Sequence, residues 1–248
     1  MKYIPNFITS LNLASGFIAI IYASTGELMT ASWLILAAMI FDFLDGFSAR
    51  LLKAYSGIGK ELDSLADIVS FGVAPAVILF YLIRPSFQNA FLAAATGFWI
   101  QVAAAALFIT VLMPVCAALR LAKFNTDETQ TKSFKGLPTP ANAIAVITVI
   151  AAAEFSTMPL LKSFTGSPAA ILIYTVILSL LMVTNIPLLS LKFTNLKFRG
   201  NEGRYILIGL CLMLFVIFGF ASTPLIIPFY ILVSLAEKFS LKKQTINS

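Results

Sequence analysis

Long apolar stretches alternate with short polar ones along the whole chain. Because a helix of about 20 apolar residues spans the hydrocarbon core of a bilayer, stretches near this length predict membrane crossings. They occupy residues 5–24, 29–50, 64–83, 90–121, 140–157, 168–190, 204–220 and 223–237. We therefore predict an all-α polytopic membrane protein with eight crossings. The stretch 90–121 is too long for one upright crossing and predicts a tilted helix or an interfacial segment.

Composition supports this fold class. Hydrophobic residues make up 59% of the 248 residues and charged residues 11%, whereas soluble proteins carry about 25% charged residues. The longest polar stretches, 123–138 and 191–204, predict loops and no soluble domain. The first residues lead into the first apolar stretch without the cleavage site of a signal peptide. The sequence thus predicts a protein made of membrane helices and loops.

The basic residues predict the orientation. With eight crossings and a cytoplasmic N-terminus, 15 of the 17 Lys and Arg residues lie on the cytoplasmic side, and only Arg84 and Lys162 lie outside. This asymmetry follows the positive-inside rule and favours the cytoplasmic membrane, with both termini inside. The net charge of +6 then reflects basic residues that set the membrane topology and face anionic lipid headgroups. We therefore expect no nucleic-acid partner.

The absence of histidine removes many kinds of site. It excludes Ser-His and Cys-His nucleophile schemes and histidine metal sites. Cys116 and Cys211 lie in apolar stretches without a CxxC motif, which indicates buried thiols and neither a disulfide framework nor a zinc site. Any metal must therefore be bound by carboxylates, which favour Mg²⁺ or Mn²⁺.

Four of the five aspartates fall within 26 residues: Asp42, Asp45, Asp63 and Asp67. Asp42 and Asp45 are three apart near the end of the second apolar stretch, so they share one helix face. Asp63 and Asp67 are four apart at the start of the third stretch and also share a face. The connection 51–62 can turn these helices into an antiparallel pair. The four carboxylates would then meet at the cytoplasmic end of the helices.

Four carboxylates without a basic partner repel one another and are costly to bury, which predicts a site for divalent cations, with two ions expected. The alternative is that the acids cap helix ends at the membrane surface. Asp63 fits an N-terminal cap. Asp42 and Asp45, however, lie near a helix C-terminus, where the macrodipole disfavours negative charge.

Small residues between the acids complete a longer motif. The stretch reads Asp42-x2-Asp45-Gly46-x2-Ala49-Arg50-x8-Gly59-x3-Asp63-x3-Asp67. Glycine and alanine in membrane helices commonly serve helix packing, and they also let a ligand approach the backbone. In every fixed position the stretch resembles the signature of the CDP-alcohol phosphatidyltransferase family. The resemblance covers about residues 1–190 and implies a six-helix catalytic core there, leaving a C-terminal helix pair and tail at 191–248.

The resemblance implies metal-dependent transfer of a phosphatidyl group from a CDP-activated lipid to an alcohol, with release of CMP, by a homodimer. It implies that the four aspartates ligate two Mg²⁺ or Mn²⁺ ions and that Asp67 is also the general base. The residues implied for binding the CDP-lipid are Thr9, Asn12, Gly46, Ala49, Arg50 and Gly59. For Thr9 and Asn12 the alternative is hydrogen bonding between helices.

Three weaker stretches, residues 70–76, 118–125 and 134–142, resemble the phosphatidylserine synthase branch of the family. This implies CDP-diacylglycerol as the donor and L-serine as the acceptor. The residues predicted to meet the acceptor carboxylate or a lipid phosphate on the cytoplasmic face are Arg120, Lys123 and Lys135. The alternative for Lys123 and Lys135 is ordinary loop charge.

Two other functions stay open. The shared motif does not separate serine from glycerol phosphate, inositol phosphate or a choline-type alcohol. An ion-coupled transporter would also use carboxylates, but transporter sites lie near the bilayer midplane between internal repeats. Here the acids lie at one end of the predicted helices, and the two halves of the chain show no convincing repeat.

Overall fold

The computed structural model describes residues 3–54, 56–93, 106, 108–126, 134–189, 198 and 201–246, and nearly all of this backbone is helical. The longer helices are α1 (Tyr3–Ser24), α2 (Leu28–Leu51), α3 (Gly57–Asp67), α4 (Ala74–Ala93), α6 (Leu112–Thr126), α7 (Thr139–Phe155), α8 (Pro159–Gly166), α9 (Pro168–Val183), α10 (Glu202–Phe218) and α11 (Ile226–Ile246). Short elements complete the fold: the π-helix η1 (Ile68–Val73), the 3₁₀ helices η2 (Phe108–Val111) and η3 (Gly219–Leu225), and the strands β1 (Phe134–Lys135) and β2 (Pro187–Leu188).

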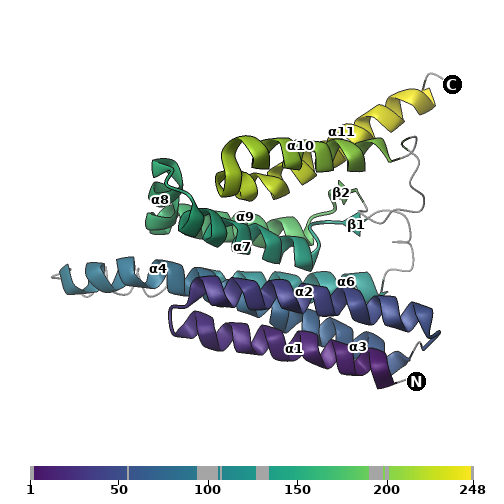
Figure 1. The fold of residues 1–248 in the computed structure, drawn as a ribbon, viewed down its shortest axis with the longest axis horizontal. Helices are drawn as coiled ribbons and strands as arrows, with labels where there is room; N and C mark the ends of the chain where they lie inside the picture. The colour runs from purple at the N-terminus through teal and green to yellow at the C-terminus, as the bar shows by residue number, and fades with distance from the viewer. Residues whose placement is uncertain are drawn as a thin grey trace.

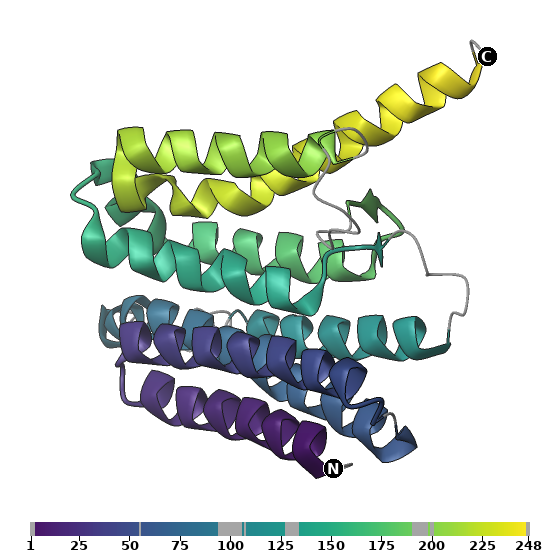
Figure 2. The same cartoon turned by 45° about the vertical axis from the view of Figure 1, so that its right-hand side comes forward.

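The helices run roughly along one direction and are stacked in chain order (Figures 1 and 2). Helices α1, α2 and α3 form one side of the molecule, α4 and α6 follow, α7 and α9 lie next, and α10 and α11 form the opposite side. The start of α1, the end of α2, the start of α3 and both strands lie toward the same end (Figure 1). The motif residues are therefore carried to one end of the helix stack.

Several helical stretches are long and apolar enough to cross a membrane. They are Tyr3–Ser24, Leu28–Leu51, Gly57–Pro85, Phe108–Thr126 and Glu202–Lys238. Helices α8 and α9 meet at 82° and provide a sixth crossing if they count as one broken span. These stretches confirm the prediction of an all-α polytopic membrane protein. Helix α7 is equally apolar but shorter, with 17 residues.

Some predicted boundaries are wrong. Helix α4 extends to Ala93, so the start of the predicted crossing 90–121 belongs to the preceding helix. The next described crossing is Phe108–Thr126, and residues 94–105 lie outside the described part of the chain. The predicted crossing 168–190 is also too long, because α9 ends at Val183 and the chain continues into β2. Continuous apolar composition hides these ends, since hydropathy does not register where helical hydrogen bonding stops.

The C-terminal helices form a hairpin. Gly219, with a φ of 57°, ends α10, and the chain then turns through η3 into α11. The two helices pack on one another, as Figure 2 also shows. The two apolar stretches predicted at the C-terminus are thus the arms of one helical hairpin.

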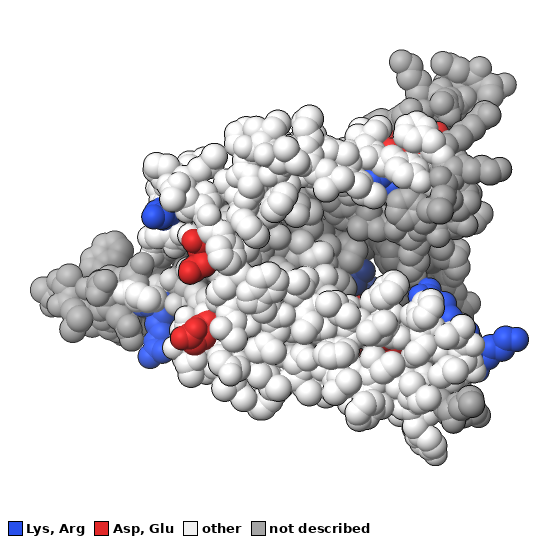
Figure 3. Space-filling view, in the orientation of Figure 1, with Lys and Arg blue, Asp and Glu red and all other residues white. Residues whose placement is uncertain are grey.

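The interior and the outer surface differ in side-chain size. Buried positions of α1 and α2 are mainly small, including Ala19, Ala23, Ala31 and Ala38, which lets these helices approach closely. Large apolar side chains face outward, such as Val216, which is 84% exposed. In Figure 3 an uncharged band separates charged residues at the two ends of the visible face. This distribution suits a protein surrounded by lipid.

Candidate active site

The end of α2 and the start of α3 carry the acidic motif. The chain reverses between them through Lys53, which has a φ of 48°, and Ser56 then caps α3 by accepting a hydrogen bond from the Gly59 N–H at 3.0 Å. This turn reverses the chain, so that carboxylates from the end of α2 and from α3 come together, while α1 packs against both helices. The predicted reversal of the chain is therefore present, but in the described structure α1 joins α2 and α3, which pack little against each other directly.

Three of the four motif carboxylates form a compact cluster. One oxygen from each of Asp42, Asp63 and Asp67 lies within 4.8 Å of the other two. Carboxylate ligands bind Mg²⁺ at about 2.1 Å and Ca²⁺ at about 2.5 Å, so oxygens that share one such ion lie no more than about 5 Å apart. The three oxygens therefore fit the ligand shell of a single hard cation.

Burial makes this cluster costly without a counter-charge. Asp67 is 8% exposed, and its Oδ1 has no hydrogen-bond partner in the described structure. The charges of Asp42 and Asp63 act on it, and the guanidinium of Arg120 offsets only part of that repulsion. The single positive charge of Arg120 cannot neutralise three clustered carboxylates. The three aspartates therefore have the net negative charge and the unpartnered oxygen expected of a divalent metal site.

Asp45 lies next to this cluster and is not part of it. Its charge acts on Asp42, Asp63 and Asp67, but it does not belong to the group whose oxygens all lie within 4.8 Å of one another. It is buried, and its Oδ2 has no hydrogen-bond partner in the described structure. The expectation of one four-carboxylate cluster is thus refined to three acids together and a fourth beside them.

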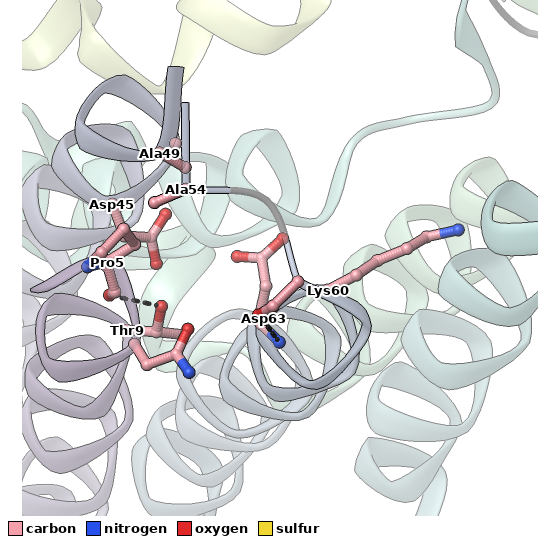
Figure 4. A pocket seen from close by; sticks show the side chains of 11 residues that line it. Pro5, Thr9, Asp45, Ala49, Ala54, Lys60 and Asp63 are labelled. Atoms are coloured by element: carbon pink, nitrogen blue, oxygen red, sulfur yellow. Dashed lines mark hydrogen bonds between the residues drawn. The ribbon is translucent and has the colours of Figure 1, made fainter. Parts of the chain in front are cut away.

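Asp45 faces a cavity of about 210 Å³ between α1, α2 and α3. In Figure 4, Asp45 and Asp63 point into it from facing helices. Its wall consists of Pro5, Asn6, Thr9, Asp45, Gly46, Ala49, Ala54, Ser56, Gly59, Lys60 and Asp63. The cavity therefore adjoins the carboxylate cluster directly, because Asp63 belongs to both.

Four of the six residues predicted to bind the CDP-lipid line this cavity: Thr9, Gly46, Ala49 and Gly59. The other two do not line it. Asn12 is fully buried one turn further along α1, and its side-chain amide has no hydrogen-bond partner among the described residues. Arg50 is exposed in the last turn of α2, where its charge suits the helix dipole.

The two motif glycines have different surroundings. A Cβ at Gly59 would lie 2.9 Å from both Asn6 Oδ1 and Ser56 Oγ, so the start of α1 packs closely against α3 there. A Cβ at Gly46 would meet nothing within 4 Å, because that side of α2 opens into the cavity. Close packing explains the glycine at position 59. At position 46 no packing contact requires a glycine in the described structure, and the open cavity is the feature that a larger side chain would change.

Lys60 was not among the predicted site residues. It lines the cavity, but its side chain extends away from Asp63 in Figure 4, and its Nζ donates to the Asn125 carbonyl oxygen at 3.3 Å. Asn125 in turn donates to Ser64 Oγ at 2.8 Å. These bonds attach the end of α6 to α3, which a lone lysine in the sequence could not indicate.

The segment after Asp67 is held by buried polar contacts. It forms the π-helix η1, a feature that often occurs at functional sites. Ser70 Oγ donates to the Asn12 carbonyl oxygen at 3.0 Å, and Asn142 Nδ2 donates to the Phe71 carbonyl oxygen at 3.1 Å. Helices α1 and α7 thereby position the turn that follows Asp67. Asn142 lies in the 134–142 stretch, but its spacing gave no reason to assign it a role.

Arg120 joins the cluster to a second, smaller cavity. It is 7% exposed, and it interacts electrostatically with Asp67 and with Tyr230 of α11. Its guanidinium lies 6.0 Å from the centre of the Phe124 ring. A cavity of about 20 Å³ beside it is lined by Arg120, Lys123, Phe124, Met182, Val183, Thr184 and Asn185.

Two of the three basic residues predicted for the acceptor therefore come together. Arg120 and Lys123 share the small cavity, and Lys123 is otherwise exposed. The third, Lys135, is the last residue of β1, and the position of its side chain lies outside the described structure. Thr184, Asn185 and Tyr230 were not predicted, because nothing in their local sequence distinguishes them from other polar residues near helix ends.

Comparison with known proteins agrees with this motif. The family model for CDP-alcohol phosphatidyltransferase matches residues 2–194. A CDP-diacylglycerol–serine O-phosphatidyltransferase of Helicobacter pylori (strain ATCC 700392 / 26695) is 34% identical over 201 residues, which cover 78% of this chain and 72% of the relative. Another of Bacillus subtilis (strain 168) is 33% identical over 206 residues, covering 82% and 96%. An archaetidylserine synthase of Methanothermobacter thermautotrophicus is 35% identical over 146 residues, covering 58% and 55%.

Proposed function

The chain belongs to the CDP-alcohol phosphatidyltransferase family, and we propose that it transfers the phosphatidyl group of CDP-diacylglycerol to the hydroxyl of L-serine, forming phosphatidylserine and CMP. The observation that carries the chemistry is the Asp42, Asp63 and Asp67 cluster beside the cavity of α1, α2 and α3. The names of the relatives from H. pylori and B. subtilis support serine as the acceptor.

Asp42, Asp63 and Asp67 would hold one Mg²⁺ or Mn²⁺ ion, and Asp45 with Asp63 would contribute to a second. The proximity of the three oxygens and the unpartnered oxygens of Asp67 and Asp45 support this assignment. Bound divalent ions would supply charge neutralisation for the pyrophosphate and for the CMP leaving group. The aspartates would hold these ions at the end of the cavity where the donor phosphates would lie.

The cavity would bind the CDP end of the donor. Gly46 and Ala49 present little side chain on the α2 wall, which leaves room for the nucleotide, and the Thr9 hydroxyl offers a polar contact from α1. Thr9 Oγ1 donates to the Pro5 carbonyl oxygen at 3.0 Å, so it retains acceptor capacity toward the cavity. The family resemblance also assigns Asn12 and Arg50 to donor binding, although neither residue lines the cavity.

Asp67 would act as the general base. As the serine oxygen forms its bond to the phosphatidyl phosphorus, the bond from that phosphorus to the CMP oxygen breaks, and the hydroxyl proton passes to the Asp67 carboxylate. Arg120 is charge-coupled to Asp67 and lines the small cavity with Lys123, so both can hold the serine carboxylate near the base. Lys135 is the third candidate for this contact.

The membrane context is part of the same proposal. The N- and C-termini and the active site would lie on the cytoplasmic side of the cytoplasmic membrane, as the basic residues favour. The catalytic domain would comprise residues 1–190, with the C-terminal helix pair and tail at 191–248. A homodimer embedded in membrane lipid is proposed on the family resemblance alone.

The proposal is tested with the purified full-length protein in lipid nanodiscs. The assay supplies CDP-diacylglycerol and Mn²⁺ and compares L-serine with glycerol phosphate, inositol phosphate and choline, measuring CMP release and the lipid product. We expect CMP and phosphatidylserine with serine alone, and no product in EDTA. Transfer only to another alcohol would overturn serine as the acceptor. No CMP with any alcohol, despite bound donor and metal, would overturn the transferase assignment.

A further inference from the structure

Helix α11 lies outside the matched family region, yet it contacts β2, which follows the residues that line the Arg120 cavity. Tyr230, in the second turn of α11, is 3% exposed. Its hydroxyl donates to the Leu189 carbonyl oxygen at 2.8 Å. One buried tyrosine therefore connects the C-terminal hairpin to the chain just after β2.

A second hydroxyl of α11 completes this attachment. Ser234 Oγ accepts a hydrogen bond from the Leu189 N–H at 3.1 Å and donates to the Tyr230 carbonyl oxygen at 2.6 Å. Both backbone polar groups of Leu189 are thus bonded to side chains of α11. Because a buried backbone group without a partner is costly, these two bonds define where Leu189 lies.

The same segment forms one wall of the small cavity. Thr184 and Asn185 line the cavity, and the chain runs from them through β2 to Leu189 in a few residues. Opposite α11, this segment is bonded to the chain around β1: the Gly136 N–H donates to the Ile186 carbonyl oxygen at 2.8 Å. A Cβ at Gly136 would lie 2.7 Å from the Thr184 carbonyl oxygen, so the approach is close. The segment that follows the cavity wall is therefore hydrogen-bonded both to the chain beside β1 and to α11.

Tyr230 also lies near Arg120, the charged residue of this cavity. The guanidinium of Arg120 lies within electrostatic range of the Tyr230 side chain as well as of Asp67. The phenol is thus bonded to one wall of the cavity and lies within electrostatic reach of the residue that forms the other wall.

We propose that Tyr230 is a positioning residue for the acceptor: through Leu189 it holds the Thr184–Asn185 wall against Arg120 and so sets the binding of serine. The inference rests on the proposed function of the Arg120 cavity as the acceptor site. It gives the C-terminal hairpin a role in acceptor binding, whereas the donor cavity is built from α1, α2 and α3.

The test is Tyr230→Phe, which removes one hydroxyl and keeps the ring. We expect the KM for serine to rise about fivefold or more, the factor that corresponds to the loss of one hydrogen bond of about 1 kcal/mol. The KM for CDP-diacylglycerol and the thermal unfolding temperature should change no more than in the control. The control is Tyr174→Phe, since that buried hydroxyl also donates to a carbonyl oxygen, that of Ala145, at 2.8 Å.

Ser234→Ala is the second variant. It removes the partner of the Leu189 N–H without touching the Tyr230 ring, and it should raise the KM for serine in the same direction. Its control is Ser179→Ala, because buried Ser179 bonds only the Thr175 carbonyl oxygen of its own helix, at 2.7 Å, in the described structure. Agreement between the two α11 variants would identify the attachment, and not the phenol alone, as the positioning feature.

The outcomes separate this inference from the proposed function. If the wild-type protein releases no CMP with serine, the proposed acceptor fails, and the inference fails with it. If the wild-type protein uses serine but Tyr230→Phe matches Tyr174→Phe in all constants, the inference alone is overturned. An equal change in both KM values and in thermal stability would also overturn it, because that pattern indicates a purely structural role. A selective rise in the KM for serine supports it.

Discussion

Replacing Gly16 with alanine tests how closely α1 must approach the turn that follows Asp67. A Cβ added at Gly16 would lie 2.7 Å from Ser70 Cα and 2.8 Å from Ser70 Cβ. Rotating the Ser70 side chain cannot relieve this clash, since neither atom moves with that rotation. Helix α1 and η1 must therefore separate until the contact reaches about 3.4 Å, a displacement of roughly 0.7 Å.

This displacement has two consequences. Overpacking in a close helix contact costs about 1–3 kcal/mol of stability, and the Ser70 to Asn12 hydrogen bond lengthens with it. Asp67 lies one turn before Ser70, so the carboxylate moves relative to Asp42 on α2. Because a misplacement of about 1 Å can reduce catalysis about 100-fold, we expect kcat to fall about tenfold or more.

The assay measures CMP release and thermal unfolding of Gly16→Ala in nanodiscs at saturating donor, serine and Mn²⁺. Gly209→Ala is the control, because a Cβ at that position of α10 would meet nothing within 4 Å. Ser70→Ala separates loss of the hydrogen bond from displacement of the helix. Wild-type turnover and stability in Gly16→Ala would refute the reasoning, since it would mean that the close approach does not position Asp67.

Three further predictions concern the site itself. Asp63→Asn and Asp42→Asn should each lower activity by orders of magnitude and raise the Mn²⁺ concentration needed for half-maximal activity. Neither should lower the unfolding temperature, because neutralising one of the clustered charges relieves repulsion. Near-normal turnover in either variant would contradict the metal site. Asp67→Asn should abolish transfer while CDP-diacylglycerol binding stays measurable by calorimetry, and retained transfer would exclude Asp67 as the base. Gly46→Leu should raise the KM for CDP-diacylglycerol without destabilising the protein, and an unchanged KM would show that the cavity is not the donor site.

The sequence by itself determined the fold class and the location of the chemistry. The apolar stretches predict membrane helices because a bilayer requires long apolar segments with internally bonded backbones. The spacing within each pair, Asp42 with Asp45 and Asp63 with Asp67, predicts that the pair shares one helix face, because helical periodicity follows directly from residue number. Because the chain contains no histidine, the side chains of the motif that can ligate a metal are its carboxylates.

Only the tertiary structure decided how these faces meet. It places Asp45 beside the carboxylate cluster, not in it, since the rotation of α2 against α3 depends on packing with α1 and not on residue spacing. It also brings Tyr230 to Arg120 across 110 residues of chain. Helical periodicity specifies which residues share a face, whereas close packing and buried hydrogen bonds between distant segments select which faces touch.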